Sequence, residues 1–296
     1  MKFGLIWLLV YSVVFIAAKA YAEPPTLRFG MPVEYHSMLA TWIEGNAVSA
    51  FEKGSVRLID RTMAEQLIVI RALKVAGFKH KSELISIPSI QRAAAMAKQG
   101  RIDLLGTSYW STDPNIDDIF IRTDTYIKQG EALVGFFTAS NNKYALASKS
   151  KDELSKLSYV VVKDWHIDIK TLKKYKHLDI HQAEEFRYLM RALEAHHADV
   201  ALLEFQRKGG LGRFHWDMKN KDKPEWVFPI ANFKTYLDGE RLFLISKKSP
   251  WADELLEAMN EGLALMRESG ELRQLLVRAG YYPEEVDNWK EVDLSH

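Results

Sequence analysis

Aromatic, hydroxyl and charged side chains follow directly after four short apolar segments of the sequence. They are Glu34, Tyr35 and His36 after 26–31, Thr107, Ser108, Tyr109 and Trp110 after 102–106, Asp164, Trp165 and His166 after 159–163, and Glu204 and Arg207 after 200–203. Hydroxyls can bind polar or anionic groups, carboxylates can bind cations, and aromatic rings form a flat apolar wall with a polar edge. This combination is typical of a site that binds a small polar molecule.

Each of these side chains also has an interpretation without a ligand. The aromatic rings can pack between a loop and a sheet. Glu204 follows a buried segment and therefore needs a partner, which can be a cationic ligand group or a base such as Arg207. Arg207 in turn can bind an anionic group. Arg92 fits an ordinary solvated helix position better than a binding site.

No catalytic or metal-binding pattern stands out. His196 and His197 are adjacent and point in different directions, so we interpret them as cations at a helix end. The glycines in 209–212 do not form a phosphate loop, because no strand leads directly into them and no Lys-Ser or Lys-Thr pair follows. We expect no metal, no cofactor and no catalytic residues.

The elements that must position these side chains alternate between strand and helix. In the first half, strands are predicted at 26–31, 83–87 and 102–106. A helix that opens with a capping box at 62–65 ends at Gly77, and a second helix over 90–97 ends at Gly100. Alternating elements of this kind predict a parallel sheet with helices on both faces.

The second half repeats this scheme. A strand is predicted at 159–163, a helix at 186–193 and a strand at 200–203. Asp103 and Asp199 occupy the same place in the two halves, between the end of a helix and an apolar strand. Ser249 and Pro250 open a further helix, and a last short one covers 272–279. We therefore predict an α/β fold of two similar lobes.

Two strand-like runs, 132–138 and 241–246, are the predicted crossings of a two-segment hinge. They divide the chain into a discontinuous first lobe, 23–131 with 242–296, and a second lobe, 132–241. The carboxyl ends of the strands then face one cleft, where ligands bind in open α/β sheets.

The N-terminus predicts export. Lys2 precedes the apolar run 5–18, and Ala20-Tyr21-Ala22 resembles a cleavage site before Glu23, so residues 1–22 have the layout of a secretory signal peptide. Without Lys2 and Lys19, the 40 basic residues become 38 against 39 acidic ones, a net charge of −1. This balance argues against nucleic acid as a partner. There are no cysteines, and hence no disulfide or lipid attachment through a thiol.

Five segments in order resemble extracellular solute-binding protein family 3, which includes the polar amino-acid binders of ABC transporters. They are Gln99 to Gly106, Thr123 to Tyr126, Lys151 to Val162, Ala198 to Glu204, and Pro250 to Leu272. The resemblance implies the type II periplasmic binding fold, a ligand between the lobes and no cofactor. It also adds Tyr126 to the candidate ligand-binding residues.

The sequence departs from the family at one position. The arginine that holds the carboxylate of an amino-acid ligand in that family is replaced by Asn115 in the segment Tyr109 to Asn115. The nearest following arginine is Arg122. Glu204 matches in type the family's aspartate for the ligand ammonium group. We therefore expect weak or no binding of common α-amino acids.

We expect a periplasmic monomer that binds a small molecule and passes it to an inner-membrane permease. One alternative is a sensor that reports the ligand to a membrane signalling partner. Another is a periplasmic dehydratase-like enzyme that would use Glu204 and His166 as acid and base.

Overall fold

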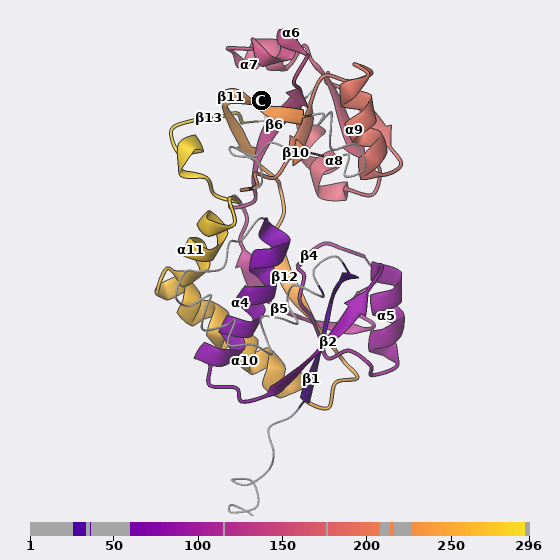
Figure 1. The fold of residues 1–296 in the computed structure, drawn as a ribbon, viewed down its shortest axis with the longest axis vertical. Helices are drawn as coiled ribbons and strands as arrows, with labels where there is room; N and C mark the ends of the chain where they lie inside the picture. Colours follow the sequence, from indigo (N-terminus) through magenta and orange to yellow (C-terminus); the bar gives the residue numbers. More distant parts are fainter. Residues whose placement is uncertain are drawn as a thin grey trace, which may run out of the picture.

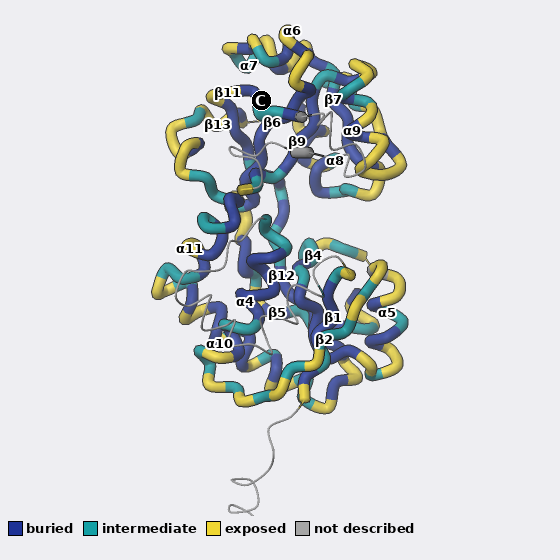
Figure 2. The backbone as a smooth tube through the Cα atoms, in the orientation of Figure 1, coloured by how far each residue is buried: buried dark blue, intermediate teal, exposed yellow. Residues whose placement is uncertain are grey.

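A computed structural model of the chain describes residues 26–33, 36, 60–114, 116–175, 177–207, 214–215 and 226–293. The described chain forms two α/β lobes, one above the other, joined along one side (Figure 1). This is the predicted fold class. Buried residues run through the middle of both lobes and through the segments that join them (Figure 2).

The first lobe is built on a six-stranded sheet. Its order is β2 (Lys81–Ile87), β1 (Thr26–Pro32), β3 (Leu104–Leu105), β12 (Arg241–Ser246) and β4 (Tyr109–Trp110), with β5 (Phe120–Ile127) also paired to β12. β1 runs parallel to β2 and β3, and β12 is antiparallel to its neighbours. Helix α5 (Ile90–Lys98) covers one face. Helices α4 (Arg61–Val75), α10 (Ala252–Glu268) and α11 (Glu271–Arg278) cover the other (Figure 1).

Strand β12 shows why both faces of this sheet must be covered. Leu242 and Leu244 belong to the apolar cluster under α5, whereas Phe243 and Ile245 belong to the cluster under α4 and α10. Successive side chains of a strand point to opposite faces. A continuous apolar run such as 242–245 is therefore buried on both sides.

The second lobe has a five-stranded sheet in the order β10 (Phe214–His215), β11 (Trp226–Tyr236), β6 (Leu133–Ala139) and β9 (Ala201–Leu203), with β13 (Lys290–Glu291) paired to β11. β7 (Ser158–Val162) pairs in parallel with β8 (Asp179–Ala183), and a bridge between Tyr159 and Val200 connects this pair toward β9. The helices of this lobe are α6 (Lys143–Leu146), α7 (Lys151–Leu154), α8 (His166–Leu172) and α9 (Phe186–Glu194).

The crossings between the lobes are shorter than the predicted segments. β6 and β12 are embedded in the two sheets, so the chain crosses at 128–132, between β5 and β6, and at 237–240, between β11 and β12. The two crossings touch, since the amide of Leu237 donates to the carbonyl of Ala132 at 2.8 Å. The predicted runs were strongly apolar because they are buried strands, and apolarity alone does not separate a strand from a linker.

A third crossing follows α11. The chain passes through the short helix η1 (Glu284–Val286) to β13, which lies parallel to β11 in the second sheet. The predicted assignment of the whole segment 242–296 to the first lobe therefore differs from the structure, in which its last described strand pairs in the second. A two-residue strand has too little periodicity to be found from the sequence.

Two helix starts also differ from the prediction. α4 begins at Arg61, where the Asp60 side chain accepts a hydrogen bond from the Met63 amide, so Thr62 does not cap the helix. α10 begins at Ala252, two residues after Pro250. The glycine ends are confirmed, because Gly77 and Gly100 adopt φ of 76° and 65°, which side-chain-bearing residues rarely do.

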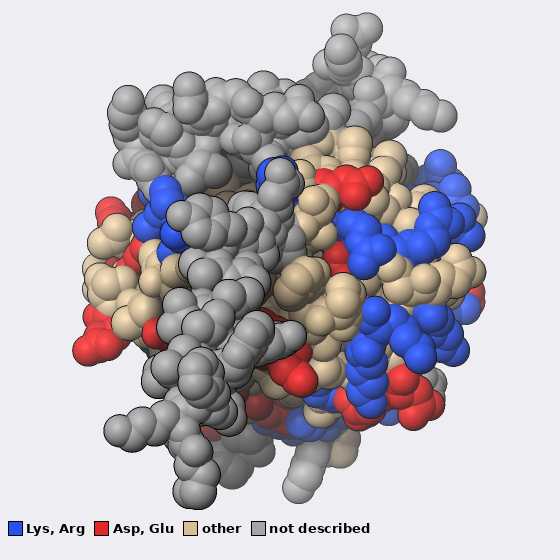
Figure 3. Space-filling view, turned by 90° about the horizontal axis from the view of Figure 1, so that it is seen from below, with Lys and Arg blue, Asp and Glu red and all other residues tan. Residues whose placement is uncertain are grey.

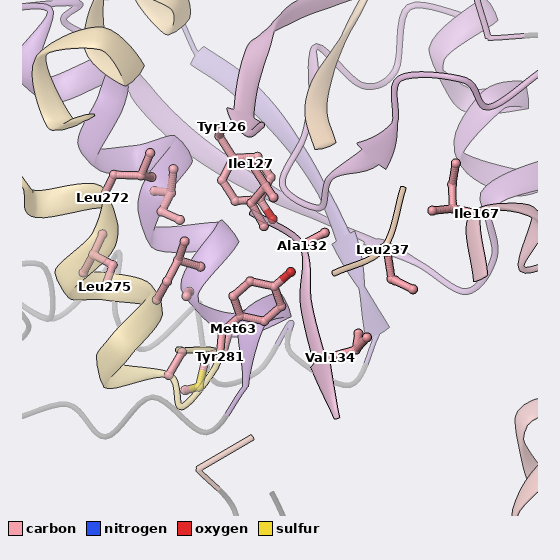
Figure 4. Close-up of a cluster of buried hydrophobic side chains, with 14 of the residues drawn as sticks. Met63, Tyr126, Ile127, Ala132, Val134, Ile167, Leu237, Leu272, Leu275 and Tyr281 are labelled. Carbon is pink, nitrogen blue, oxygen red and sulfur yellow. The ribbon is translucent and has the colours of Figure 1, made fainter. Parts of the chain in front are cut away.

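A buried apolar cluster surrounds the crossings. Tyr126, Ile127, Ala132, Val134 and Leu237 gather there (Figure 4). Met63 and Tyr281 join them from α4 and from the third crossing. The two lobes thus share one continuous core at the hinge, which fixes the side on which a cleft can open.

The surface of the described residues shows the mixture of charges that the nearly balanced sequence leads us to expect. On the face shown in Figure 3, Lys and Arg lie beside Asp and Glu in the described part of the molecule. Among the described residues, no helix has the length and apolarity needed to cross a membrane.

Candidate ligand-binding cleft

A cavity of about 330 Å³ lies between the two lobes. The first lobe contributes its charged and aromatic side chains Arg61, Trp110 and Arg241. The second lobe contributes Val134, Trp165, Asp168, Phe186, Leu202, Leu203, Glu204 and Gln206, and the crossing contributes Leu237. The volume falls in the range typical of small-molecule sites.

Glu204 lines this cavity and is bound by two arginines of the other lobe. Its carboxylate accepts from Nε of Arg61 at 2.8 Å and from Nη2 of Arg241 at 3.2 Å. Burial alone would raise the pKa of Glu204, but the charges of the two arginines outweigh it and hold the pKa below its usual range. Glu204 is therefore ionised and paired at neutral pH.

A second carboxylate lies behind Arg61. Glu65 is fully buried on α4 and accepts hydrogen bonds from Arg61, Ser108 and Tyr126. Burial raises the pKa of Tyr126 well above its usual value, so its hydroxyl stays a donor. Arg61 is thus matched on both sides by acids, and its pKa is raised by them despite the opposing effect of burial.

Aromatic rings form the walls of the cavity. The guanidinium of Arg241 lies 3.7 Å from the ring centre of Trp110, a cation–π contact. On the opposite lobe, Trp165 stacks on Phe186 with ring centres 6.0 Å apart and planes 29° from parallel. Phe186 is the first residue of α9, and Trp165 directly precedes α8.

Asp168 differs from the other acids of the cavity. It lies in the first turn of α8 and is only 7 % exposed. No hydrogen bond or ion pair joins its carboxylate to another residue of the described chain. Burial raises its pKa to about 7, with Arg241 opposing and Glu204 adding to the shift.

Contacts at the rim also cross between the lobes. Nε2 of His166 lies 3.3 Å from a carboxylate oxygen of Asp113 and 3.3 Å from the hydroxyl of Thr112. His166 is half exposed and does not line the cavity. It is therefore not placed to act on the same bound molecule as Glu204.

The structure brings some of the predicted site residues together and separates others. Trp110, Trp165 and Glu204 line the cavity, and Ser108 and Tyr126 lie behind it against Glu65. Thr107 and Tyr109 line a smaller cavity of about 140 Å³ at the end of β1 and β3. Tyr35 lies outside the described residues.

Three arginines named in the sequence analysis lie elsewhere. Arg207 does not line the cavity, and its guanidinium donates to the carbonyl of Arg278. Arg122 is paired with Asp117. Arg92 is exposed near the start of α5, as predicted. Asn115, which the sequence resemblance sets near the position of a ligand-binding arginine, lies outside the described residues.

Sequence reasoning missed Arg61, Asp168 and Arg241. Arg61 and Glu65 are one helical turn apart. Glu65 was interpreted, together with Thr62, as part of a capping box, and Arg61 was not considered. Asp168 resembles an ordinary first-turn acid. Arg241 begins a strand that was read as a crossing. An Arg four residues before a Glu on a helix was the one local signal for this cluster.

A second cavity, of about 340 Å³, lies on the other side of the crossings, between α11 and the third crossing. Tyr126, Arg267, Arg273 and Tyr282 are among its lining residues. Apart from Tyr126, it contains none of the predicted site residues. The described residues contain no group of three or more side chains placed to hold a metal ion.

Comparison with known proteins agrees with this architecture. No family model and no curated protein matches the sequence. Among solved structures, ytmK from Bacillus subtilis, described as a probable amino-acid ABC transporter extracellular-binding protein, aligns with a TM-score of 0.55 and 11 % identity over 87 % of this chain and 99 % of that one.

The VFT2 domain of Bordetella pertussis BvgS aligns as well. A double mutant has a TM-score of 0.53 and 12 % identity over 86 % of this chain and 93 % of that one. The periplasmic VFT2 domain itself has a TM-score of 0.50 and 12 % identity over 73 % and 83 %. At these identities the likeness shows the fold alone, which is the type II periplasmic binding fold that the sequence predicted.

Proposed function

We propose that this protein binds a small polar molecule in the cleft between its lobes and carries out no reaction on it. The observation that supports this most directly is the cavity of about 330 Å³ to which both lobes contribute charged and aromatic side chains. The dehydratase alternative finds no support in the geometry, because Glu204 is paired with two arginines and His166 lies at the rim.

Binding in such a cleft works by closure of the lobes. A ligand favours the closed form only if it binds that form better than the open one, so it must contact both sides. Here Trp110 lies on one side and Trp165 on the other. The crossings 128–132 and 237–240 are the segments we expect to change their backbone angles.

We further propose that the protein is exported to the periplasm, with cleavage after Ala22, and that it acts as a monomer for an ABC-type uptake system. The family resemblance supports uptake, as does the structural likeness to a probable ABC transporter binding protein. The sensor alternative would require a membrane signalling partner in place of a permease.

Identification of the bound molecule is the experiment that tests this function. Protein purified under native conditions from its host should carry a small molecule that mass spectrometry detects, and scattering should show a smaller radius of gyration with that molecule than without it. An empty protein whose radius of gyration no small molecule changes would contradict the proposal.

A pair of variants tests the location. Trp165→Ala should weaken binding of the identified molecule by about tenfold, because it removes an aromatic wall. Tyr188→Ala is the control, since Tyr188 is an exposed ring of α9 that does not line the cavity. Equal affinities of the two variants would place the site elsewhere.

A further inference from the structure

We propose that the cleft selects a small organic cation, an amine with an apolar body, and that Asp168 binds its nitrogen. This inference rests on the proposed function and specifies the ligand class of the same site. Three observations support it. The arginines of the cavity are already paired with glutamates, Asp168 is an acid outside these pairs, and aromatic and aliphatic side chains surround it.

Among the described residues, two basic groups line the cavity, and each pairs with an acid of the protein, although Nε of Arg241 is buried without a hydrogen-bond partner. Arg61 bonds Glu204 and Glu65, and Arg241 bonds Glu204. These two cations and two anions cancel. An anionic ligand that paired with either guanidinium would compete with Glu204, and displacing Glu204 would leave a buried carboxylate without its partner.

Asp168 is the acid left over from this balance. Its carboxylate lines the cavity, is shielded from bulk water and makes no hydrogen bond or ion pair with another residue within the described chain. A buried carboxylate without a partner costs free energy. A cationic ligand that donates to it would remove this cost, whereas a second anion would add to it.

Position in a helix does not account for Asp168. Acids in the first turn of a helix are stabilised by the helix dipole, and this effect needs no burial. Asp253 in the first turn of α10 has that role in an exposed position. Asp168 instead is buried and lines the cavity, and its own backbone amide is the one hydrogen-bond donor that acts on its carboxylate within the described chain.

The surroundings of Asp168 suit an amine with an apolar body. Trp165 and Phe186 present a stacked aromatic pair, and Val134, Leu202 and Leu203 add aliphatic surface. Aromatic faces attract a nearby cation, and apolar walls favour a hydrocarbon or ring beside it. Phe186 is 37 % exposed without a ligand, so a bound apolar group has surface to cover.

The test compares three probes that share a phenylethyl group and differ in the charge of the head group: 2-phenylethylamine, 2-phenylethanol and 3-phenylpropionate. Calorimetry at pH 8 measures each against the wild type, Asp168→Asn and Asp253→Asn. The amine should bind best to the wild type, and Asp168→Asn should weaken it by about tenfold or more, the loss of one charged hydrogen bond. Asp253→Asn should bind the amine as tightly as the wild type does. Asp168→Asn should leave the affinity for the alcohol unchanged.

The outcomes separate this inference from the proposed function. Preference for the carboxylate or the alcohol, or amine binding that survives Asp168→Asn, would overturn the cation assignment and leave a small-molecule cleft standing. If no probe binds and the protein from its host also carries no small molecule, both proposals fail. If the host's molecule is an anion, only the cation assignment fails.

Discussion

Each lobe has an aspartate at the same step of the chain, between a helix and a strand, and hydrogen bonds tie it to another strand, β1 in the first lobe and β7 in the second. The amide of Asp103 donates to the carbonyl of Arg28, and its carboxylate accepts from the Arg28 amide at 2.9 Å. The amide of Asp199 donates to the carbonyl of Ser158, and its carboxylate accepts from the Ser158 amide at 3.0 Å. The backbone pattern is the same.

The side chains that complete the two ties differ. In the first lobe, Nε and Nη2 of Arg28 bond the fully buried Asp103 at 2.8 and 2.7 Å. In the second, Asp199 is less buried and accepts from Asn142 and from the Ser158 hydroxyl, both neutral, at 2.9 Å. The two lobes therefore share the backbone geometry of the turn. The more buried carboxylate is bonded by a charged guanidinium, and the less buried one by neutral groups.

From this comparison we expect Asp103→Ala to cause the largest loss of stability of the variants considered. The substitution leaves the amide, Nε and Nη2 of Arg28 without this acceptor, whereas Nη1 keeps its hydrogen bond to the carbonyl of Gly100. We expect a loss of about 2–4 kcal/mol in the free energy of unfolding, moderated because Arg28 is partly exposed. Urea denaturation measures it. A loss no larger than that of Asp199→Ala would show that burial and charge do not distinguish the two ties.

Asp168 provides a contrast to these two aspartates, because its carboxylate accepts no hydrogen bond from another residue of the described chain. Its pKa is raised from 3.8 to about 7, so the folded state holds the proton more tightly than the unfolded state. Stability is then lost as pH rises from about 4 to about 7. Arg241 and Glu204 are the charged groups that act on it, and the titratable side chain of His166 lies two residues before it in the chain.

Asp168→Asn should therefore stabilise the ligand-free protein at pH 8, by about 2 kcal/mol, and have little effect at pH 4. Thermal unfolding at the two pH values measures this, with Asp253→Asn as the exposed first-turn control. Destabilisation at pH 8 would mean that the helix dipole outweighs burial at Asp168.

The smallest effect is expected for Asp199→Ala. The variant loses hydrogen bonds to neutral groups at a half-buried site, which corresponds to about 1–2 kcal/mol. These bonds hold the pKa of Asp199 below its usual value although burial opposes them. Wild-type protein should thus lose this contribution as pH falls through that lowered pKa, and the variant should not. Urea midpoints between pH 6 and pH 3 compare them.

Local patterns in the sequence sufficed for much of the architecture. Buried strands such as β12 are continuous apolar runs, α5 and α9 show helical spacing, and glycines with positive φ end α4 and α5. Asp103 and Asp199 could be paired as equivalent because both ties depend on a short helix–turn–strand step. Such features depend on neighbours within a few residues, and the sequence records them directly.

The interior of the cleft depended on residues far apart in the chain. Arg61 and Glu204 are 143 positions apart, and no spacing rule connects them. The sequence predicted that Glu204 needs a partner and named Arg207, but the turn after β9 directs Arg207 toward α11 and leaves Glu204 facing Arg61 and Arg241. Only the packing of one lobe against the other decides which acids pair with a base, and within the part of the chain that the structure describes it leaves Asp168 without one.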